Sequence, residues 1–401
     1  MNVRRGAAVI VAVIGFSVCA PAWASTQAGQ ATSLRGVRPV LGRLPSSAVG
    51  QLSASAREAS VARIVRVTKA TRPAKGHLTL TPASLTYQGG HMKLSWSSAH
   101  AKVCTLSSKP RFWSGPNPAR VKCRGKLTAK LPALAIGVHW RFTFKAKAAK
   151  GKASTVRRTL VLHKPPFPVS SNWSGYIVPS ATPVTSVSGD FTVPTLNCQK
   201  TRNAGEAAWV GIGGAGGTSG DLLQTGVVSE CINGVQVENP AWWEEFPESA
   251  ADLFDAATMK VSPGDLIQAS VSQSPDTSWT TRVDDLTTKV SGVMHTGTGG
   301  QWGTVRDSDG APLSTPQDSS TFTYAGGGTA EWIVEDFGTS TGLVPFADFG
   351  TVTFTGLATS LPAWGLTPSE QVGLGDRAGL LLAVPSAPDS SGKGFSVAYT
   401  G

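Results

Sequence analysis

The N-terminal part of the sequence has almost no acidic residues, and the C-terminal part has few basic ones. Residues 1–168 contain a single acid, Glu58, together with 28 of the 36 lysines and arginines. Residues 169–401 hold the other 8 basic residues and 24 acids, which gives this part a net charge of −16. The overall net charge of +11 therefore describes neither part, and nucleic-acid binding by the chain as a whole is not expected.

The acidic part also lacks the residues that many hydrolytic and metal sites require. Its one histidine is His295, and it contains neither a GxSxG nor an HExxH sequence. A Ser-His-Asp triad would depend on that single histidine, and a three-histidine zinc site is excluded. Gly211 to Gly216 reads GxGxxG, but the next run, Asp221 to Val228, predicts a strand where a phosphate-binding loop needs a helix. No metal and no other cofactor are expected.

Long apolar runs are absent apart from one short stretch near the N-terminus. Two arginines precede the apolar residues 6–20, and Ala22-Trp23-Ala24 follows as a small-x-small cleavage site. This pattern predicts a signal peptide over residues 1–24, and its apolar run is too short to span a membrane. The protein is therefore expected to be secreted, extracellular and without a membrane anchor.

Cysteines are few, and one of the five, Cys19, lies in the signal peptide. The other four are Cys104, Cys123, Cys198 and Cys231, and none has the CxxC spacing of a zinc ribbon. Four cysteines allow three pairings, and the charge boundary favours Cys104–Cys123 and Cys198–Cys231. Two disulfides fit an oxidising compartment and would leave no thiol as a nucleophile.

After the signal peptide, composition divides the chain into four parts. Residues 25–76 are rich in Ala, Ser, Arg and Gly, which predicts a basic leader, disordered and acting as a propeptide. Residues 77–163 have short alternating runs separated by turns, which predicts a small β-sandwich, and the stretch MKLSWSSAHAKVCTLSS resembles immunoglobulin-like modules of bacteria. Residues 164–168, KPPFP, predict a stiff linker. Residues 169–401 alternate repeatedly without a long helical period, so an all-β fold with a large antiparallel β-sandwich is expected.

Three runs of the large domain place polar side chains among strand-forming residues. In the first, Gln224 is the one amide in the apolar run DLLQTGV; the second, AWWEEFPE, mixes aromatic and acidic residues. In the third, AEWIVEDF, the two-residue period of a strand puts Glu331 and Glu335 on one face. Trp332 and Val334 then face the other way. Aromatic side chains beside polar groups are suited to holding an extended peptide or a sugar chain.

These runs belong to an ordered set of blocks that resembles the glutamic peptidases, also called eqolisins. The blocks are SNWSGY from Ser171, AWVGI from Ala208, LQTG from Leu223, WWE from Trp242 with FPE from Phe246, SPGD from Ser262, AEWIVEDF from Ala330 and VPFA from Val344. All of them fall within residues 169–401. The resemblance implies a lectin-like sandwich of two antiparallel sheets and an endopeptidase that acts on protein or peptide substrates.

The resemblance also implies roles for single residues. It makes Gln224 and Glu331 the catalytic pair, and it places Trp209, Trp242 and Glu244 near the substrate-binding cleft. A single glutamate can first act as base on water and then as acid on the leaving nitrogen, while an amide donates and accepts hydrogen bonds without titrating. We therefore expect a water held between the pair and activity at low pH.

One position departs from the family pattern. Many members carry an acid directly after the AWVGI block, where this chain has Gly213. A secondary hydrogen bond to the site is then missing or supplied from elsewhere. Glu335, on the face of Glu331, is interpreted as a structural carboxylate and not as a second catalyst.

Two other classes of function use similar residues. A glycoside hydrolase would use Glu331 with Glu335 or Glu244 as its two carboxylates, flanking a sugar in an aromatic cleft. A lectin-like module without activity would use the tryptophans as sugar platforms. Gln224 favours the peptidase, because neither alternative requires an amide at that place.

The separation of charge predicts control of the enzyme by its own N-terminal region. At neutral pH the basic region and the acidic domain should attract each other, so the basic region could cover the cleft as an intramolecular inhibitor. Acid protonates the carboxylates and weakens this attraction, with cleavage expected near residues 164–169. Alternatively, residues 77–163 remain in the mature protein as an accessory domain. A monomer is expected.

Overall fold

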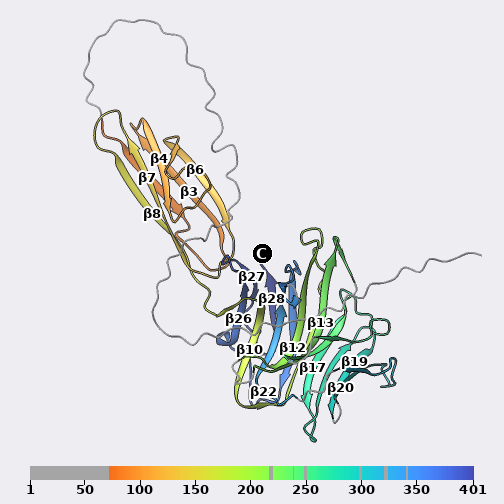
Figure 1. The fold of residues 1–401 in the computed structure, drawn as a ribbon. Coiled ribbons are helices and arrows are strands. Elements are labelled where there is room, and N and C mark those ends of the chain that lie inside the picture. The colour runs from red at the N-terminus through yellow and green to blue at the C-terminus, as the bar shows by residue number, and fades with distance from the viewer. Residues whose placement is uncertain are drawn as a thin grey trace, which may run out of the picture. The chain divides into compact units, whose positions relative to one another are not determined.

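The protein is described by a computed structural model, in which the chain forms two compact units. The described residues are 72–215, 220–237, 239–247, 251–297, 300–319, 324–339 and 342–401. Of these, the N-terminal unit contains residues 72–166 and 378–380, and the large unit contains residues 167–377 and 381–401 (Figure 1). The expected signal peptide and the leader up to residue 71 lie outside the described residues. No helix in the described ranges is long and apolar enough to cross a membrane.

The N-terminal unit, orange to yellow in Figure 1, consists of two sheets. The three-stranded sheet has the order β1 (Lys75–Thr81), β3 (Gly90–Ala99), β6 (Arg124–Leu131). The five-stranded sheet has the order β2 (Ser84–Leu85), β8 (Ser154–Leu162), β7 (Val138–Lys147), β4 (Val103–Lys109), β5 (Ala119–Val121). The first strand begins two residues before the start of the module expected from the sequence, and β2 pairs with β8 in parallel.

Strict alternation builds the core of this unit. In β7 the aromatic residues Trp140, Phe142 and Phe144 are buried, and they alternate with exposed Arg141 and half-buried Thr143. These rings pack against buried aliphatic residues of the three-stranded sheet. The expected disulfide between Cys104 and Cys123 is present beside this core.

Two mostly antiparallel sheets form the large unit. The first, here called the site sheet, has the order β10 (Trp173–Val184), β22 (Gly327–Glu335), β12 (Ala204–Gly213), β13 (Leu222–Ile232), β15 (Ala241–Phe246), β16 (Asp252–Leu253). The second, the back sheet, has the order β28 (Phe395–Tyr399), β25 (Thr351–Thr359), β11 (Ser186–Thr192), β17 (Leu266–Gln273), β18 (Trp279–Asp285), β19 (Val290–Gly297), β20 (Gly300–Arg306), β21 (Gln317–Ser319). The all-β fold and the large antiparallel sheet expected from the sequence are confirmed.

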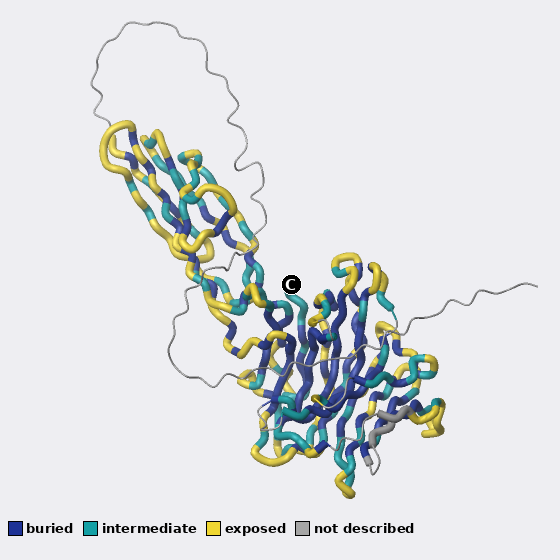
Figure 2. The backbone as a smooth tube through the Cα atoms, in the orientation of Figure 1, coloured by how far each residue is buried: buried dark blue, intermediate teal, exposed yellow. Residues whose placement is uncertain are grey.

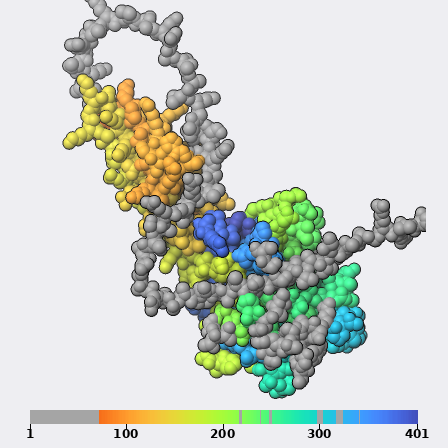
Figure 3. Space-filling model, in the orientation of Figure 1, coloured from red at the N-terminus to blue at the C-terminus, as the bar shows by residue number. Residues whose placement is uncertain are grey.

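Shorter strands complete the large unit. β9 (Val169–Ser170) pairs in parallel with β26 (Gln371–Gly375), and β26 continues to β27 (Leu381–Pro385) and β10. β14 (Val235–Gln236) extends the β13 hairpin, β23 (Gly338–Thr339) pairs with β24 (Gly342–Leu343), and η2 (Pro368–Glu370) is a single 3-10 turn. Figure 3 shows the same view as a space-filling model, in which the C-terminal residues are dark blue. The pairing of β10 with β26 brings the two ends of this unit together.

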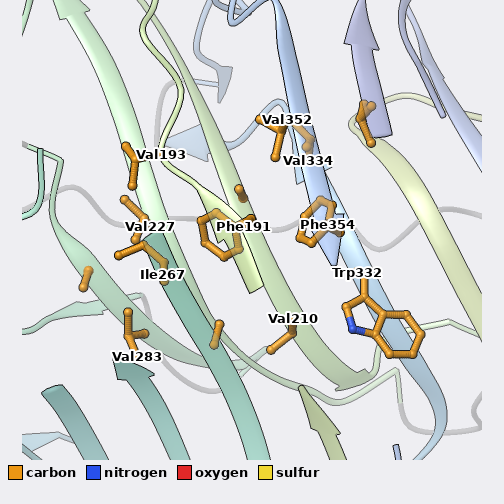
Figure 4. Close-up of a cluster of buried hydrophobic side chains, with 14 of the residues drawn as sticks. Phe191, Val193, Val210, Val227, Ile267, Val283, Trp332, Val334, Val352 and Phe354 are labelled. Carbon is orange, nitrogen blue, oxygen red and sulfur yellow. The ribbon is translucent and has the colours of Figure 1, made fainter. Parts of the chain in front are cut away.

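The main hydrophobic core lies between the two sheets. Figure 4 shows Phe191 and Phe354 from the back sheet opposite Val210 and Trp332 from the site sheet. The two phenylalanine rings lie 5.5 Å apart between centroids. Trp332 and Val334 face this core, as the two-residue period of AEWIVEDF predicts.

The site sheet is also covered on its other face, so its central strands are buried on both sides. A second apolar cluster there includes Trp173, Trp209 and Ile333. All ten residues of β12 are buried, and the site sheet is dark blue over long stretches in Figure 2. Polar side chains on this second face are therefore held in an interior environment. The expected disulfide between Cys198 and Cys231 is present, with Cys231 near the end of β13.

Candidate active site

Gln224 and Glu331 come together because of strand order and register in the site sheet. β12 lies between β13 and β22, and Gly211 of β12 is the register partner of both Gln224 and Glu331. Directly paired residues point to the same face of a sheet, so both side chains project from the face opposite the main core. Their Cα atoms are separated by two strand spacings, about 10 Å. The two side chains therefore extend from either side of a residue that has no side chain of its own.

Gly211 leaves room for the side chains that pack over it between the pair. A Cβ atom built on Gly211 would lie 2.9 Å from the Trp209 ring, 2.9 Å from the Leu222 side chain and 3.2 Å from Cβ of Gln224. Any larger residue would crowd the tryptophan and displace Gln224. The glycine is thus part of the site geometry, although the alternation of residues along the strand does not indicate this role.

Gln224 is completely buried and is oriented by Glu244 on the next strand. The two residues are register partners, and the Gln224 Nε2 donates to Glu244 Oε2 at 2.5 Å. Oε1 of Gln224 has no hydrogen-bond partner among the described residues. Burial, together with the negative charge of Glu335, raises the pKa of Glu244 well above its usual range. The amide is therefore held at one N–H, while its carbonyl oxygen remains available to a bound molecule.

Glu331 is also completely buried. Its Oε1 lies 2.9 Å from the hydroxyl of Thr329, which is two residues earlier in β22 and therefore on the same face. Oε2 has no hydrogen-bond partner within the described ranges. Burial raises the pKa of Glu331 well above its usual range, and the Thr329 hydroxyl and the Ala215 backbone act in the opposite direction. A carboxyl group with a raised pKa is a stronger base when ionised and retains a proton longer after taking it up.

Glu335 lies on the same face, but both of its oxygens accept hydrogen bonds from neighbouring side chains. Its Oε2 accepts a hydrogen bond from Trp209 Nε1 at 2.8 Å, and its Oε1 accepts one from Asn172 Nδ2 at 3.0 Å. Burial raises the pKa of Glu335 to about 7. Both oxygens are occupied by neutral donors, which fits the structural interpretation of this carboxylate.

Residues that are register partners across neighbouring strands form a row across the sheet, and Gln224, Gly211 and Glu331 make up the catalytic row. Trp209 and Trp242 lie in the neighbouring row. Gly226 of β13 is the register partner of both tryptophans, so this row repeats the arrangement of the catalytic row. Trp209 packs edge-on against Trp173 with 5.1 Å between ring centroids. Both tryptophans are buried, on the face that also carries Gln224, Glu331 and Glu244. The five residues that the sequence assigns to the site therefore share one face of one sheet.

The glycine that departs from the family pattern has a structural reason. Gly213 has φ of +99°, and a Cβ atom there would overlap the carbonyl oxygen of Asp221 and lie 2.8 Å from the Tyr324 hydroxyl. No acidic side chain fits on this backbone. The Tyr324 hydroxyl fills the space and donates to the Ile212 carbonyl, while the Thr329 hydroxyl reaches the Gly213 carbonyl at 2.9 Å.

Thr329 and Tyr324 were not identified from the sequence. The position of Thr329 could have been found, because a residue two before Glu331 must share its face. Tyr324 lies outside any strand and carries no local signal of its position.

The Cα spacing of the acidic residues gives no support to a glycoside hydrolase. Four residues along a strand place Glu331 and Glu335 about 13 Å apart at Cα, and three strand spacings place Glu331 and Glu244 about 14 Å apart. Glycosidases hold their two carboxyl groups about 5 to 9.5 Å apart. At the level of their Cα atoms, both pairs are therefore more widely spaced than the two carboxyl groups of a glycosidase. No group of three or more His, Cys, Asp or Glu side chains suited to a metal ion occurs within the described ranges.

Comparison with known proteins identifies similar sequences. The model of the peptidase A4 family matches residues 171–371. Aspergillopepsin-2 of Aspergillus niger is 33% identical over 204 residues, which cover 46% of this chain and 63% of that protein, just under two thirds of its length. Scytalidopepsin B of Scytalidium lignicola is 31% identical over 214 residues, which cover 51% of this chain and 68% of that protein.

Similar solved structures come from the same group. A crystal structure of scytalido-glutamic peptidase with a transition-state analogue inhibitor has 26% identity and covers 58% of this chain and 99% of that one, with a TM-score of 0.43. The crystal structure of aspergilloglutamic peptidase from Aspergillus niger has 30% identity and covers 49% of this chain and 99% of that one, with a TM-score of 0.34.

Proposed function

Since the chain belongs to the peptidase A4 family, we propose that it is an endopeptidase that cleaves peptide bonds with Gln224 and Glu331 as its catalytic pair. The observation that carries this proposal is the shared register partner, Gly211, which puts the two side chains on one face, on either side of a residue that has no side chain. No cofactor takes part in the reaction.

The chemistry requires one water molecule between the two side chains. Ionised Glu331 takes a proton from this water as the water oxygen attacks the peptide carbonyl carbon. An N–H of Gln224 donates to the oxyanion that develops on the carbonyl oxygen, which an amide does without changing charge. Glu331 then gives its proton to the peptide nitrogen, the C–N bond breaks, and an acid and an amine leave.

The residues around the pair support binding of an extended peptide. Trp209 and Trp242 place apolar rings on the same face in the next row, and Glu244 holds the Gln224 amide. Substitution of Glu244 by Gln would replace the acceptor of the Gln224 N–H by a group that also carries donors. We propose these three residues as the substrate-binding and orienting surroundings of the pair.

The test compares Glu331→Gln and Gln224→Ala with the wild-type protein on denatured protein substrates and on polysaccharides. Both variants should lose most peptidase activity, by a factor of about 100 or more, while remaining folded. Glu230→Gln is the control, because this half-buried carboxyl belongs to the same strand as Gln224 but lies at its other end. Normal cleavage by Glu331→Gln, or hydrolysis of polysaccharide by the wild type, would refute the proposal.

We propose further that the protein is secreted and made as a zymogen. Its two disulfides, Cys104–Cys123 and Cys198–Cys231, are of the kind that persists in an oxidising compartment. The N-terminal unit supplies a polycationic surface: residues 72–166 contain 19 lysines and arginines and no acid. In β7 and β4, exposed Arg141 and Lys109 are direct register partners, a like-charge pair that is unfavourable unless an anionic surface lies against it.

The acidic large unit is the anionic surface that this proposal requires. At neutral pH its carboxylates would attract the N-terminal region, and in acid they would be protonated and release it. N-terminal sequencing after incubation of the whole chain at about pH 3–4, near the ordinary pKa of carboxyl groups, tests this. A new N-terminus near residues 164–169 with a rise in activity is expected. An intact chain that is fully active at neutral pH would contradict it.

A further inference from the structure

The Thr329 hydroxyl contacts two acceptor oxygens, but its single proton can be donated to only one of them at a time. Its Oγ1 lies 2.9 Å from the carbonyl oxygen of Gly213 and 2.9 Å from Oε1 of Glu331. A threonine hydroxyl donates one hydrogen bond and accepts others. A backbone carbonyl only accepts, so when Thr329 donates to Gly213, the second contact is a hydrogen bond only if Glu331 is the donor.

Two arrangements follow from this count of protons. When Glu331 is a carboxylic acid, its O–H donates to Thr329, and the Thr329 O–H donates to the Gly213 carbonyl. When Glu331 is a carboxylate, the Thr329 O–H turns to Glu331 and leaves the Gly213 carbonyl. The heavy atoms keep their positions in both arrangements, and only the hydroxyl hydrogen rotates.

We propose that Thr329 is a positioning residue that holds Glu331 in place through both of its protonation states. This inference rests on the proposed function, in which Glu331 first takes up a proton and then gives it away. Because Thr329 serves first as donor and then as acceptor, Glu331 need not move between the two steps. The backbone at Gly213 excludes the acid that many family members have at this position. Here the secondary hydrogen bond to Glu331 comes from Thr329, on the same strand as Glu331.

The surroundings of Glu331 offer few other groups that could take this role. The titratable groups that act electrostatically on Glu331 or are affected by it are Glu335 on its own strand and Tyr324 ahead of β22. The hydroxyl of Tyr324 donates to the Ile212 carbonyl, and both oxygens of Glu335 accept from other residues. Thr329 is therefore the one side chain, within the described ranges, that forms a hydrogen bond with Glu331.

The test uses Thr329→Val, which keeps the shape but removes the hydroxyl, and Thr329→Ser, which keeps the hydroxyl. Thr329→Val should lower kcat by about 10- to 100-fold, as expected for loss of a hydrogen bond to a charged group, with little change in KM. Because the carboxylate loses its donor, the pKa of Glu331 rises further, and the acid limb of the kcat/KM profile moves to higher pH. Thr329→Ser should restore both kcat and the profile.

Thr225→Val is the matched control. Thr225 is a buried threonine on β13 whose hydroxyl donates to the Trp242 carbonyl at 2.6 Å, but it faces the main core. This variant should lose stability without moving the pH profile. If Glu331→Gln is inactive while Thr329→Val keeps the wild-type profile, the role of Thr329 is refuted and the catalytic pair stands. If Glu331→Gln is fully active, the proposed function itself fails.

Discussion

Gln224 and Glu331 lie on the same face of the site sheet, two strands apart, and Gly211 is the register partner of both. Backbone pairing, and not a contact between the two side chains, therefore fixes their separation. A sheet buried on both faces is a stiff support, because its ladder and its packing resist changes in register. The same face carries a second row in which Gly226 lies between Trp209 and Trp242.

Replacement of Gly211 by Ala should damage activity more than stability. The new methyl group would lie 2.9 Å from the Trp209 ring and the Leu222 side chain, and 3.2 Å from Cβ of Gln224. Overpacking of this kind costs about 1–3 kcal/mol of folding free energy. Displacement of Gln224 should reduce kcat by about tenfold or more, since positioning errors of about 1 Å are costly to catalysis.

Gly365→Ala is the control for that experiment, because an added methyl group at Gly365 meets only one atom, at 3.9 Å. Steady-state kinetics and urea unfolding of both variants provide the comparison. A Gly211→Ala protein with wild-type kcat would show that the pair does not need a residue without a side chain between them.

Gly213→Ala tests whether the backbone excludes a side chain at the position where the family often has an acid. Gly213 has φ of +99°, and its added Cβ would overlap the Asp221 carbonyl oxygen. The variant should lose well over 1–2 kcal/mol of stability, because strain and a backbone clash add together. Gly213→Asp should be at least as unstable and should not improve activity.

Gly310→Ala separates the cost of backbone strain at a positive φ from the cost of the steric clash at Gly213. Gly310 has φ of +82°, with no atom within 4 Å of an added Cβ, so it carries the strain alone. Urea unfolding should show a clearly smaller loss for Gly310→Ala. Equal losses at the two positions would mean that the close approach at Gly213 has no consequence.

Local pattern predicted which face each residue of AEWIVEDF occupies, but not which residues meet across the sheet. The two-residue period is a property of any strand, and Trp332 does lie in the main core while Glu331 faces the other way. The partner of Glu331 is more than a hundred positions away in the chain, and no local signal encodes the register that Gly211 sets. The resemblance to the glutamic peptidases predicted Gln224 as the partner of Glu331, whereas the two-residue period did not.

Buried acids were the other feature that local pattern missed. Glu206 lies among apolar residues of β12, and Glu245 lies in β15, both with almost no exposed surface. Alternation rules place charged residues in solvent, so they give no warning of acids in a strand that is covered on both faces. The physical consequence of such burial appears in the pKa values and therefore in the dependence of stability on pH.

Stability should fall as pH rises from acid to neutral. Burial raises the pKa of Glu206 and of Asp336 to about 8, and that of Glu335 to about 7. In the unfolded chain these groups ionise near their ordinary values of 4.5 and 3.8. The folded state therefore holds protons that the unfolded state has released, so stability is greatest below about pH 4 and is lost as pH rises through 7 and 8. For Glu206 alone the difference is on the order of 5 kcal/mol.

Urea unfolding between pH 4 and pH 8 measures this slope. Glu206→Gln should flatten it, because a neutral amide has no proton to lose, whereas Asp309→Asn at an exposed position should leave it unchanged. A wild-type protein that is more stable at pH 8 than at pH 4 would contradict the burial of these acids.

The hydrogen bonds of Glu335 predict a rescue experiment. Both oxygens of Glu335 accept, from Trp209 at 2.8 Å and from Asn172 at 3.0 Å. Glu335→Gln would turn an N–H₂ group towards one of these donors, which should cost about 1–3 kcal/mol and misplace the Trp209 ring beside Gly211. Activity should fall mainly in kcat, because Trp209 limits the space around Gln224.

Addition of Asn172→Asp to Glu335→Gln exchanges the donor and the acceptor between the two positions. The introduced aspartate would accept from the N–H₂ of the introduced glutamine, whose carbonyl oxygen would still accept from Trp209, so both donors are paired again. The double variant should recover most of the lost stability in urea unfolding, with a coupling free energy of about 1–2 kcal/mol in the double-mutant cycle. Additive losses would show that the Asn172–Glu335 hydrogen bond does not hold the carboxylate in place.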